Sequence, residues 1–401
     1  MGQRARRGRG VRVALAGAVA AGALATALTG PAGAASGRAA PGTAGGPQGA
    51  AAARDAMDTA VRGGIPGAIG RIEDARGTWR GTAGAGDLAK GTPRHADDRF
   101  RIGSVSKTFL ATVVLQLEDE GRLSLDDTVE KWLPGLVTGN GNDGSRITLR
   151  QLLQHTSGIY DFVYDPDFDA VYGTDAFMEH RYDRWTPEQV VGVAMKHEPE
   201  FAPGTSWKYS NTNYTLLAMV VDKAAGRPYE REIERRVIEP LKLRATSVPR
   251  TDPRLPAPHS RGYVRFTPDG ELLDVTEMSP TWAKGSGAMI STTKDLSRFY
   301  RALLGGKLLP ARQMAKMLDT VETGDTKTPR VAYGLGVFVY KFSCGVTVWG
   351  HGGSVHGSSS FVGTTLGRKG EGPARTMAFQ YNVAGAGSAH TVADAAYCAK
   401  R

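Results

Sequence analysis

Hydrophobic and polar residues alternate with two different periods along this chain. Short runs with the two-residue period of a strand occupy residues 68–73, 78–83 and 99–102, and Gly-rich turns separate them. Helical spacing follows over residues 105–120, where apolar side chains recur three and four positions apart, and Gly121 predicts the end of this helix. This segment is therefore predicted to form strands followed by one buried helix.

Beyond residue 122 the pattern is mainly helical, and strand patterns return near the C-terminus. Helices are predicted from about residue 54 to 62 and over residues 149–153, 187–195, 214–225, 229–237, 294–304 and 390–399, and strands over 331–340, 346–349, 359–365 and 376–381. We therefore predict an α/β (α+β) fold. Its antiparallel sheet would come from residues 54–104 and 286–401, flanked by helices, with an all-helical subdomain over about residues 122–285.

Residues 1–34 have the anatomy of an export signal, because five arginines precede an apolar run and small residues follow it. Ala32 and Ala34 fit a cleavage motif, and an apolar run of about 16 residues is short for a membrane span. We predict a signal peptide over 1–34, an Ala/Gly/Pro-rich linker over 35–53 and a folded domain over 54–401. A retained anchor is the alternative, and the choice between the general and twin-arginine routes stays open.

The charge and the two cysteines narrow the function classes. The formal net charge is +10, but half of it lies in the five leader arginines, and no basic stripe with interleaved aromatic residues follows, which excludes nucleic-acid binding. Cys344 and Cys398 predict one disulfide in an oxidising compartment, with two free thiols as the alternative. Since no CxxC or HExxH motif is present, we expect no metal and no cofactor. We expect a secreted monomer without a stable membrane anchor.

Ser104 and Lys107 are the first candidate catalytic residues. Ser104 stands where a strand pattern meets a helix, and Lys107 lies three positions later, on the same helical face. A serine hydroxyl needs a neighbouring base, and a buried lysine with a lowered pKa can serve. The backbone N–H of Ser104 at the helix start could stabilise an oxyanion. The same Ser-x-x-Lys motif recurs at Ser291 and Lys294, where a polar helix start predicts only a helix N-cap.

Two later segments supply partners for this pair. Tyr209 and Asn211 alternate in an extended loop, so both can face one cleft. A phenol near the lysine ammonium could lose its proton more easily and transfer it between Ser104 and a leaving group, and the amide could hold a substrate carbonyl. His351 and Gly353 follow an apolar strand, where glycines let a substrate approach, and the N–H of Ser354 could complete the oxyanion hole. Each segment alone is typical of an ordinary helix cap or loop.

The order Ser104-x-x-Lys107, Tyr209-x-Asn211, His351-x-Gly353 resembles the three signature motifs of penicillin-recognising serine hydrolases. It is most similar to the branch with class C β-lactamases and Streptomyces-type secreted D-alanyl-D-alanine carboxypeptidases. The surrounding stretches at 152–159, 201–204 and 287–291 agree with this resemblance. It implies a β-lactamase/transpeptidase-like fold, in which Ser104 forms an acyl-enzyme while Lys107 and Tyr209 transfer protons.

The resemblance leaves the substrate open among peptides, amides, esters and β-lactams. A D-alanyl-D-alanine carboxypeptidase-like peptidase on D-amino-acid or peptidoglycan-type peptides is the first candidate; a D-aminopeptidase or esterase, a class C-like β-lactamase and a non-catalytic penicillin-binding sensor are the alternatives. Similar carboxypeptidases carry Thr where Gly352 stands, and an arginine on the preceding strand, where residues 337–342 offer only Lys341. Trp282 is expected to border the cleft and bind substrate, with core packing as its alternative.

Overall fold

The helix at the start of the domain begins earlier than predicted. The computed structural model describes residues 46–326, 328–367, 373–384 and 388–400, so the predicted signal peptide and most of the predicted linker lie outside the described residues. Helix α1 spans Ala50–Arg62, and Ala53 and Met57 are buried in the core. The predicted linker boundary at residue 53 and helix start at residue 54 are therefore wrong, because the alanines after residue 49 are strong helix formers.

The centre of the fold is an antiparallel sheet built from both ends of the sequence, as predicted. Its strand order is β10 (Val321–Glu322), β11 (Arg330–Tyr333), β12 (Phe338–Lys341), β13 (Thr347–Val355), β14 (Ser358–Leu366), β15 (Pro373–Tyr381), β1 (Gly67–Asp74), β2 (Gly77–Asp87) and β3 (Thr92–Pro93). Strands from the two ends of the chain meet where β1 pairs with β15, with Ile72 opposite Met377. This pairing joins the N-terminal hairpin to the C-terminal strands.

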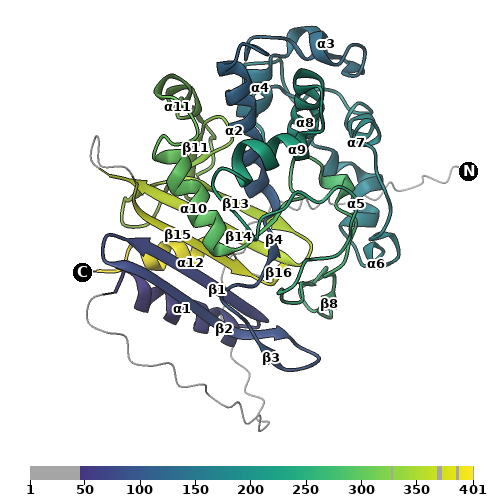
Figure 1. Cartoon of the computed structure of the whole chain (residues 1–401). Helices are drawn as coiled ribbons and strands as arrows, with labels where there is room; N and C mark the ends of the chain where they lie inside the picture. Colours follow the sequence, from purple (N-terminus) through teal and green to yellow (C-terminus); the bar gives the residue numbers. More distant parts are fainter. Residues whose placement is uncertain (1–45, 327, 368–372, 385–387, 401) are drawn as a thin grey trace, which may run out of the picture. The chain divides into compact units, whose positions relative to one another are not determined.

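Helices cover both faces of this sheet (Figure 1). Helix α10 (Thr293–Leu304) packs on one face, and α1 packs with α12 (Ala389–Tyr397) on the other. The two-residue period of β14 explains this arrangement, because Phe361 faces the α1/α12 side while its neighbour Val362 faces the α10 side. The sheet is therefore buried on both sides.

Two strand predictions near the C-terminus need correction. The run predicted as one strand over 331–340 is a hairpin of β11 and β12, because Gly336 adopts a positive φ of 80° at the turn between them. Strand β13 continues to Val355, whereas the pattern placed its end at residue 349. Its glycines weaken the strand signal although the backbone pairs with β14 throughout.

The middle of the chain is mainly helical and belongs to the same compact unit as the sheet. Its helices are α2 (Ser106–Asp119), α3 (Val129–Trp132), α4 (Leu149–Gln154), α5 (Pro166–Tyr172), α6 (Phe177–His180), α7 (Pro187–Ala194), α8 (Asn211–Ala225) and α9 (Tyr229–Ile233); α11 (Ala311–Met317) follows α10. Short strand pairs also occur: β4 (Phe100–Arg101) with β9 (Ile290–Ser291), β5 (Thr138–Gly139) with β6 (Asn142–Asp143), and β7 (Tyr263–Val264) with β8 (Leu273–Asp274) and β16 (Val383–Ala384). The prediction that residues 122–285 are all helical is therefore wrong, because this segment also contains the short strands β5, β6, β7 and β8.

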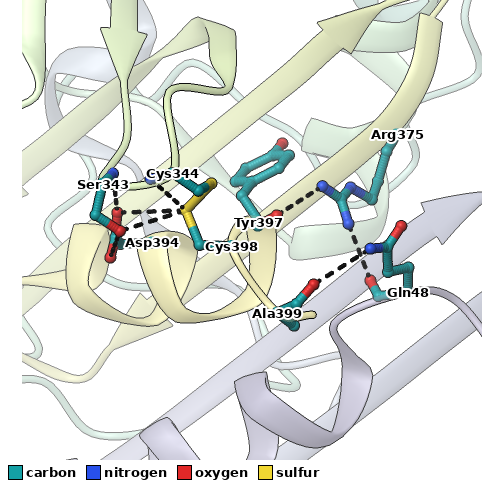
Figure 2. Close-up of a disulfide and its surroundings, with 8 residues drawn as sticks. All are labelled: Gln48, Ser343, Cys344, Arg375, Asp394, Tyr397, Cys398 and Ala399. Carbon is teal, nitrogen blue, oxygen red and sulfur yellow. Dashed lines mark hydrogen bonds between the residues drawn. A yellow bond between two sulfur atoms is a disulfide. The ribbon is translucent and has the colours of Figure 1, made fainter. Parts of the chain in front are cut away.

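The predicted disulfide is present and fixes the C-terminal helix to the sheet (Figure 2). Cys344, between β12 and β13, is joined to Cys398 at the end of α12, with 5.4 Å between their Cα atoms. Asp394 on α12 also accepts hydrogen bonds from the N–H and the hydroxyl of Ser343. In the part of the chain that the structure describes, no helix is long and apolar enough to cross a membrane.

Candidate active site

Ser104 lies in a short turn between β4 and α2, close to strand β13. The turn Gly103–Val105 is a 3-10 turn, and Gly103 has a positive φ of 51°. A Cβ on Gly103 would lie 2.8 Å from the backbone N of Ser354, so glycine is needed where the two segments touch. The backbones of Ser104 and Ser354 are thereby brought together, as an oxyanion hole requires.

Lys107 is fully buried one turn after Ser104, and three oxygens surround its Nζ atom. Nζ lies 3.1 Å from Oγ of Ser104, 2.8 Å from Oδ1 of Asn211 and 2.7 Å from the carbonyl oxygen of Ser286. A neutral amine has two N–H donors and one lone pair, and the amide and carbonyl oxygens can only accept. The lone pair of neutral Lys107 therefore faces the hydroxyl of Ser104.

The burial of Lys107 favours this neutral form. Burial lowers the pKa of Lys107 to about 7, while the nearby carboxylate of Asp161 acts in the opposite direction. Asp161 is itself buried, and burial raises its pKa to about 6. Lys107 can therefore act as a base near neutral pH. No sequence pattern selects Asp161 or Ser286, because their proximity to Lys107 arises only in the folded chain.

Tyr209 lies beside Lys107, but its protonation differs from our expectation. The ring centroid of Tyr209 is 4.9 Å from Nζ of Lys107 and 4.2 Å from the ring of His155, whose Nδ1 accepts the N–H of Ser210. Burial raises the pKa of Tyr209 well above its ordinary value. The expectation that lysine eases the loss of the phenolic proton is therefore wrong, and Tyr209 stands ready as a proton donor.

Asn211 and His351 are both in the cleft, but their polar atoms are largely engaged within the protein. Asn211 accepts from Lys107 and donates from Nδ2 to Asp161 at 2.9 Å. The ring of His351 contacts the hydroxyl of Tyr333 through Nε2 and the carbonyl of Gly352 through Nδ1. Burial lowers the pKa of His351 to about 3, so its ring is neutral. This geometry therefore does not favour the predicted contact of His351 with substrate. The ring of His351 instead stabilises the wall of the cleft.

Gly353 is required by the packing of β13 against the turn before Ser104. A Cβ on Gly353 would lie 2.0 Å from the carbonyl oxygen of Ile102. Ser360 on β14 donates its hydroxyl to the same oxygen at 3.0 Å. Any larger residue at position 353 would push the strand away from Ser104, which gives this glycine a structural reason independent of substrate.

The predicted residues meet at one cleft with a volume of about 490 Å³. Its lining includes the residues that the sequence selected, namely Ser104, Tyr209, Asn211, His351, Gly353 and Ser354. It also includes Asp161, Tyr164, Trp207, Asp325, Arg330, Phe338, Tyr340 and His390, which the sequence did not select. Over the described ranges, no three His, Cys, Asp or Glu side chains gather closely enough to hold a metal ion.

Trp282 does not line this cleft, so its predicted role in substrate binding is wrong. Its ring packs 5.7 Å from Tyr172, 6.2 Å from Phe168 and 5.9 Å from His356. These rings belong to the apolar packing under the helical middle of the chain. Core packing, the alternative for a tryptophan, is what the structure contains.

Comparisons with known proteins agree with this geometry. The family model described as Beta-lactamase matches residues 49–389. A D-stereospecific amidohydrolase from Streptomyces sp. is 50% identical, with a TM-score of 0.81, 88% of this chain covered and 99% of that one. A D-amino acid amidase from Ochrobactrum anthropi SV3, solved with L-phenylalanine amide, is 25% identical, with a TM-score of 0.73, 87% of this chain covered and 97% of that one.

Penicillin-binding protein 4* of Bacillus subtilis is 28% identical over 264 residues, which are 63% of this chain. The match spans only 55% of that relative, so the chain corresponds to about half of its length. The matched family model covers most of the chain and includes every residue that lines the cleft up to Ser388. The chain therefore belongs to the β-lactamase family of serine hydrolases, related to penicillin-binding proteins and D-amino acid amidases.

Proposed function

We propose that this protein is a D-stereospecific amidohydrolase that cleaves amides and peptides of D-amino acids with a free α-amino group. The observation that carries the proposal is the buried carboxylate of Asp161, which lines the cleft close to Lys107 and Asn211. A carboxylate in a desolvated cleft attracts a substrate ammonium group far more strongly than it would in water. The similarity to a D-stereospecific amidohydrolase and a D-amino acid amidase supports this substrate class.

The proposed reaction begins when neutral Lys107 removes the proton of Ser104. Oγ attacks the substrate carbonyl, and the N–H groups of Ser104 and Ser354 stabilise the oxyanion. As the C–N bond breaks, Tyr209 donates a proton to the leaving nitrogen and regains one from the Lys107 ammonium. Water then attacks the acyl-enzyme carbonyl and gives a proton to Lys107. As the bond between the acyl carbon and Oγ breaks, the Lys107 ammonium returns this proton to Oγ, and the acid product leaves.

A D-alanyl-D-alanine carboxypeptidase is the second candidate, and Arg330 is the observation that favours it. The sequence offered no arginine near residues 337–342, but Arg330 on β11 lines the cleft. Its guanidinium forms an ion pair of 3.4 Å with Asp325 and lies 5.6 Å from the ring of Phe338. A substrate carboxylate would have to compete with Asp325 for this charge, and for that reason we favour the amidase.

We also propose that the enzyme acts outside the cytoplasm. The predicted signal peptide and the disulfide between Cys344 and Cys398 support this location, because such bonds persist in oxidising compartments. Expression of the full chain with and without residues 1–34, followed by fractionation and N-terminal sequencing, tests it. Protein that stays in the cytoplasm with an intact N-terminus would contradict it.

A substrate panel tests the proposed activity. The purified enzyme is offered D-phenylalanine amide, L-phenylalanine amide, N-acetyl-D-phenylalanine amide and a peptide ending in D-Ala-D-Ala. We expect kcat/KM for the D-amide to exceed that for the L-amide by at least about 100-fold, and N-acetylation to cost about 10-fold or more, because the ammonium contact is lost. Preference for the D-Ala-D-Ala peptide would favour the second candidate.

Asp161→Asn separates the ammonium contact from the rest of the site. We expect this variant to lose about 10-fold in kcat/KM on the D-amide through a higher KM, but far less on the N-acetylated amide. Asp167→Asn, which changes an exposed carboxylate on the following helix, is the matched control. Equal losses of Asp161→Asn on both substrates would remove the ammonium contact from the proposal.

A further inference from the structure

The space above Gly352 on β13 is filled by a side chain from the C-terminal helix α12. A Cβ on Gly352 would lie 2.9 Å from Nε2 of His390 and 3.6 Å from the hydroxyl oxygen of Tyr340. His390 belongs to the first turn of α12, and all three residues line the cleft. His390 therefore occupies the volume that any side chain at position 352 would need.

The imidazole of His390 is held firmly in this position. Its ring centroid lies 5.3 Å from that of Tyr340 and 5.2 Å from that of Phe361. Nδ1 lies 2.8 Å from the hydroxyl of Ser388, which also accepts the backbone N–H of His390 and so caps the helix. A ring with two aromatic neighbours and a hydrogen bond cannot move aside at low cost.

The whole helix is fixed as well. The disulfide between Cys344 and Cys398 and the contacts of Asp394 with Ser343 anchor the last turns of α12 to the loop between β12 and β13 (Figure 2). Since β13 begins directly after this loop, the same anchor positions both His390 and Gly352. The fit between them is therefore built into the C-terminal part of the fold.

The polar edge at this point of the cleft is uncharged. Nε2 of His390 is buried and has no hydrogen-bond partner among the residues that the structure describes. Burial lowers the pKa of His390 to about 4, and Arg330 acts in the same direction, so the ring is neutral near pH 7. The guanidinium of Arg330 is itself paired with Asp325. A free carboxylate here would lose water without gaining an unpaired cation.

We propose that His390 is a specificity-determining residue of the cleft. Its imidazole excludes a side chain at position 352 and presents a neutral polar edge, so that an uncharged amide or ester group of the substrate is accepted there in preference to a free carboxylate. This inference deepens the proposed amidase function and rests on it. It also predicts that the side chain added by Gly352→Thr meets His390 instead of an open cleft.

A double-mutant cycle tests the steric part with a probe that does not depend on the substrate class. The rate of covalent labelling by a fluorophosphonate is measured for the native enzyme, Gly352→Thr, His390→Ala and the double variant. We expect Gly352→Thr to slow labelling at least about 10-fold more in the native background than in the His390→Ala background. Gly352→Ala, which adds only the Cβ, replaces Gly352→Thr if thermal unfolding shows that the latter does not fold.

Equal penalties in the two backgrounds would overturn the proposal, because His390 would then not fill the space. The selectivity part uses the ratio of kcat/KM for D-phenylalanine amide to that for a peptide ending in D-Ala-D-Ala. We expect His390→Ala to shift this ratio at least about 5-fold towards the peptide, whereas the exposed neighbour Thr391→Ala leaves it unchanged. An unshifted ratio in His390→Ala would also overturn it.

Failure of the proposed amidase function has a different signature. An enzyme that labels on Ser104 but prefers the D-Ala-D-Ala peptide would contradict the amidase, while the labelling cycle would still decide whether His390 excludes a side chain at position 352.

Discussion

Two segments of this chain share the motif Ser-x-x-Lys, and the fold places them side by side. Strands β4 and β9 pair with each other, with Phe100 opposite Ser291, and each strand leads directly into a helix. Ser104 lies in the turn just before α2, which carries Lys107, and Ser291 ends the strand just before α10, which carries Lys294. Both motifs therefore lie where a short strand is followed by a helix.

Their surroundings differ. Lys107 is fully buried among three oxygens, whereas Lys294 is exposed. Ser104 lines the cleft, whereas Ser291 is fully buried and its hydroxyl lies 2.9 Å from that of Thr246. The comparison teaches that the Ser-x-x-Lys motif alone does not activate its serine as a nucleophile. A base results only where the lysine is desolvated and its two N–H groups have acceptors, so that the lone pair faces the serine.

The largest expected effect comes from replacing each of the two serines with alanine. Ser104→Ala removes the nucleophile, so we expect kcat/KM to fall by at least about 1,000-fold on any substrate that the enzyme cleaves. Ser291→Ala removes the buried hydrogen bonds of its hydroxyl with Thr246 and with the carbonyl of Thr292, at a cost of about 1 kcal/mol in the free energy of unfolding, with activity retained. Steady-state kinetics and urea unfolding of both variants measure these effects; comparable activity losses would end the distinction.

The lysines are the next pair. Lys107→Met keeps the length and burial of the side chain but removes the base, and we expect acylation to slow about 100- to 10,000-fold. Lys294→Met changes an exposed side chain and is the matched control, with acylation at the native rate. Burst kinetics with a chromogenic ester measure acylation directly. A Lys107→Met enzyme that acylates as fast as the native one would remove lysine from the reaction.

The pH dependence sharpens the assignment of Lys107 as the base. Because the lysine must be neutral to accept a proton, labelling of Ser104 should rise as the pH increases through about 7, the lowered pKa of Lys107. The carboxylate of Asp161 raises this pKa, so its removal in Asp161→Asn should move the rise to lower pH. Labelling rates with an uncharged fluorophosphonate between pH 5 and pH 9 test both statements. A shift to higher pH would contradict this coupling.

The smallest expected effect concerns the start of helix α10, at the second Ser-x-x-Lys motif. Thr292, whose side chain accepts the N–H of Asp295, is the N-cap of α10. Thr292→Ala should cost about 1 kcal/mol in the free energy of unfolding and leave kcat/KM unchanged. Thermal and urea unfolding measure the cost. A loss of activity with unchanged stability would mean that this segment takes part in catalysis after all.

The sequence predicted the parts of the fold that have a clear local period. The helix after Ser104, the N-terminal hairpin and the strands near residues 360 and 378 were found because their hydrophobic repeats reflect burial on one side or both. The end of β13 was missed because its glycines weaken the strand pattern, and the turn between β11 and β12 was missed because apolar residues flank its glycines on both sides. Trp282 was misassigned because a large aromatic residue suits a core as well as a cleft.

The candidate site was predicted where motifs mark it and missed where only tertiary structure creates it. Ser104, Lys107 and Tyr209 could be selected from their spacing and order. Asp161, Arg330 and His390 come from a loop, from strand β11 and from the C-terminal helix, and no local pattern connects them with the cleft. The raised pKa of Tyr209 was also beyond the sequence, since burial at one position depends on the whole fold.

The central claim is that Ser104, and not Ser291, is the nucleophile. The most direct measurement is peptide mapping by mass spectrometry after incubation with a labelled penicillin or a fluorophosphonate at pH 8. The account predicts a single adduct on the peptide that contains Ser104, and no adduct in Ser104→Ala. An adduct on Ser291 or on any other residue, or undiminished labelling of Ser104→Ala, would contradict it.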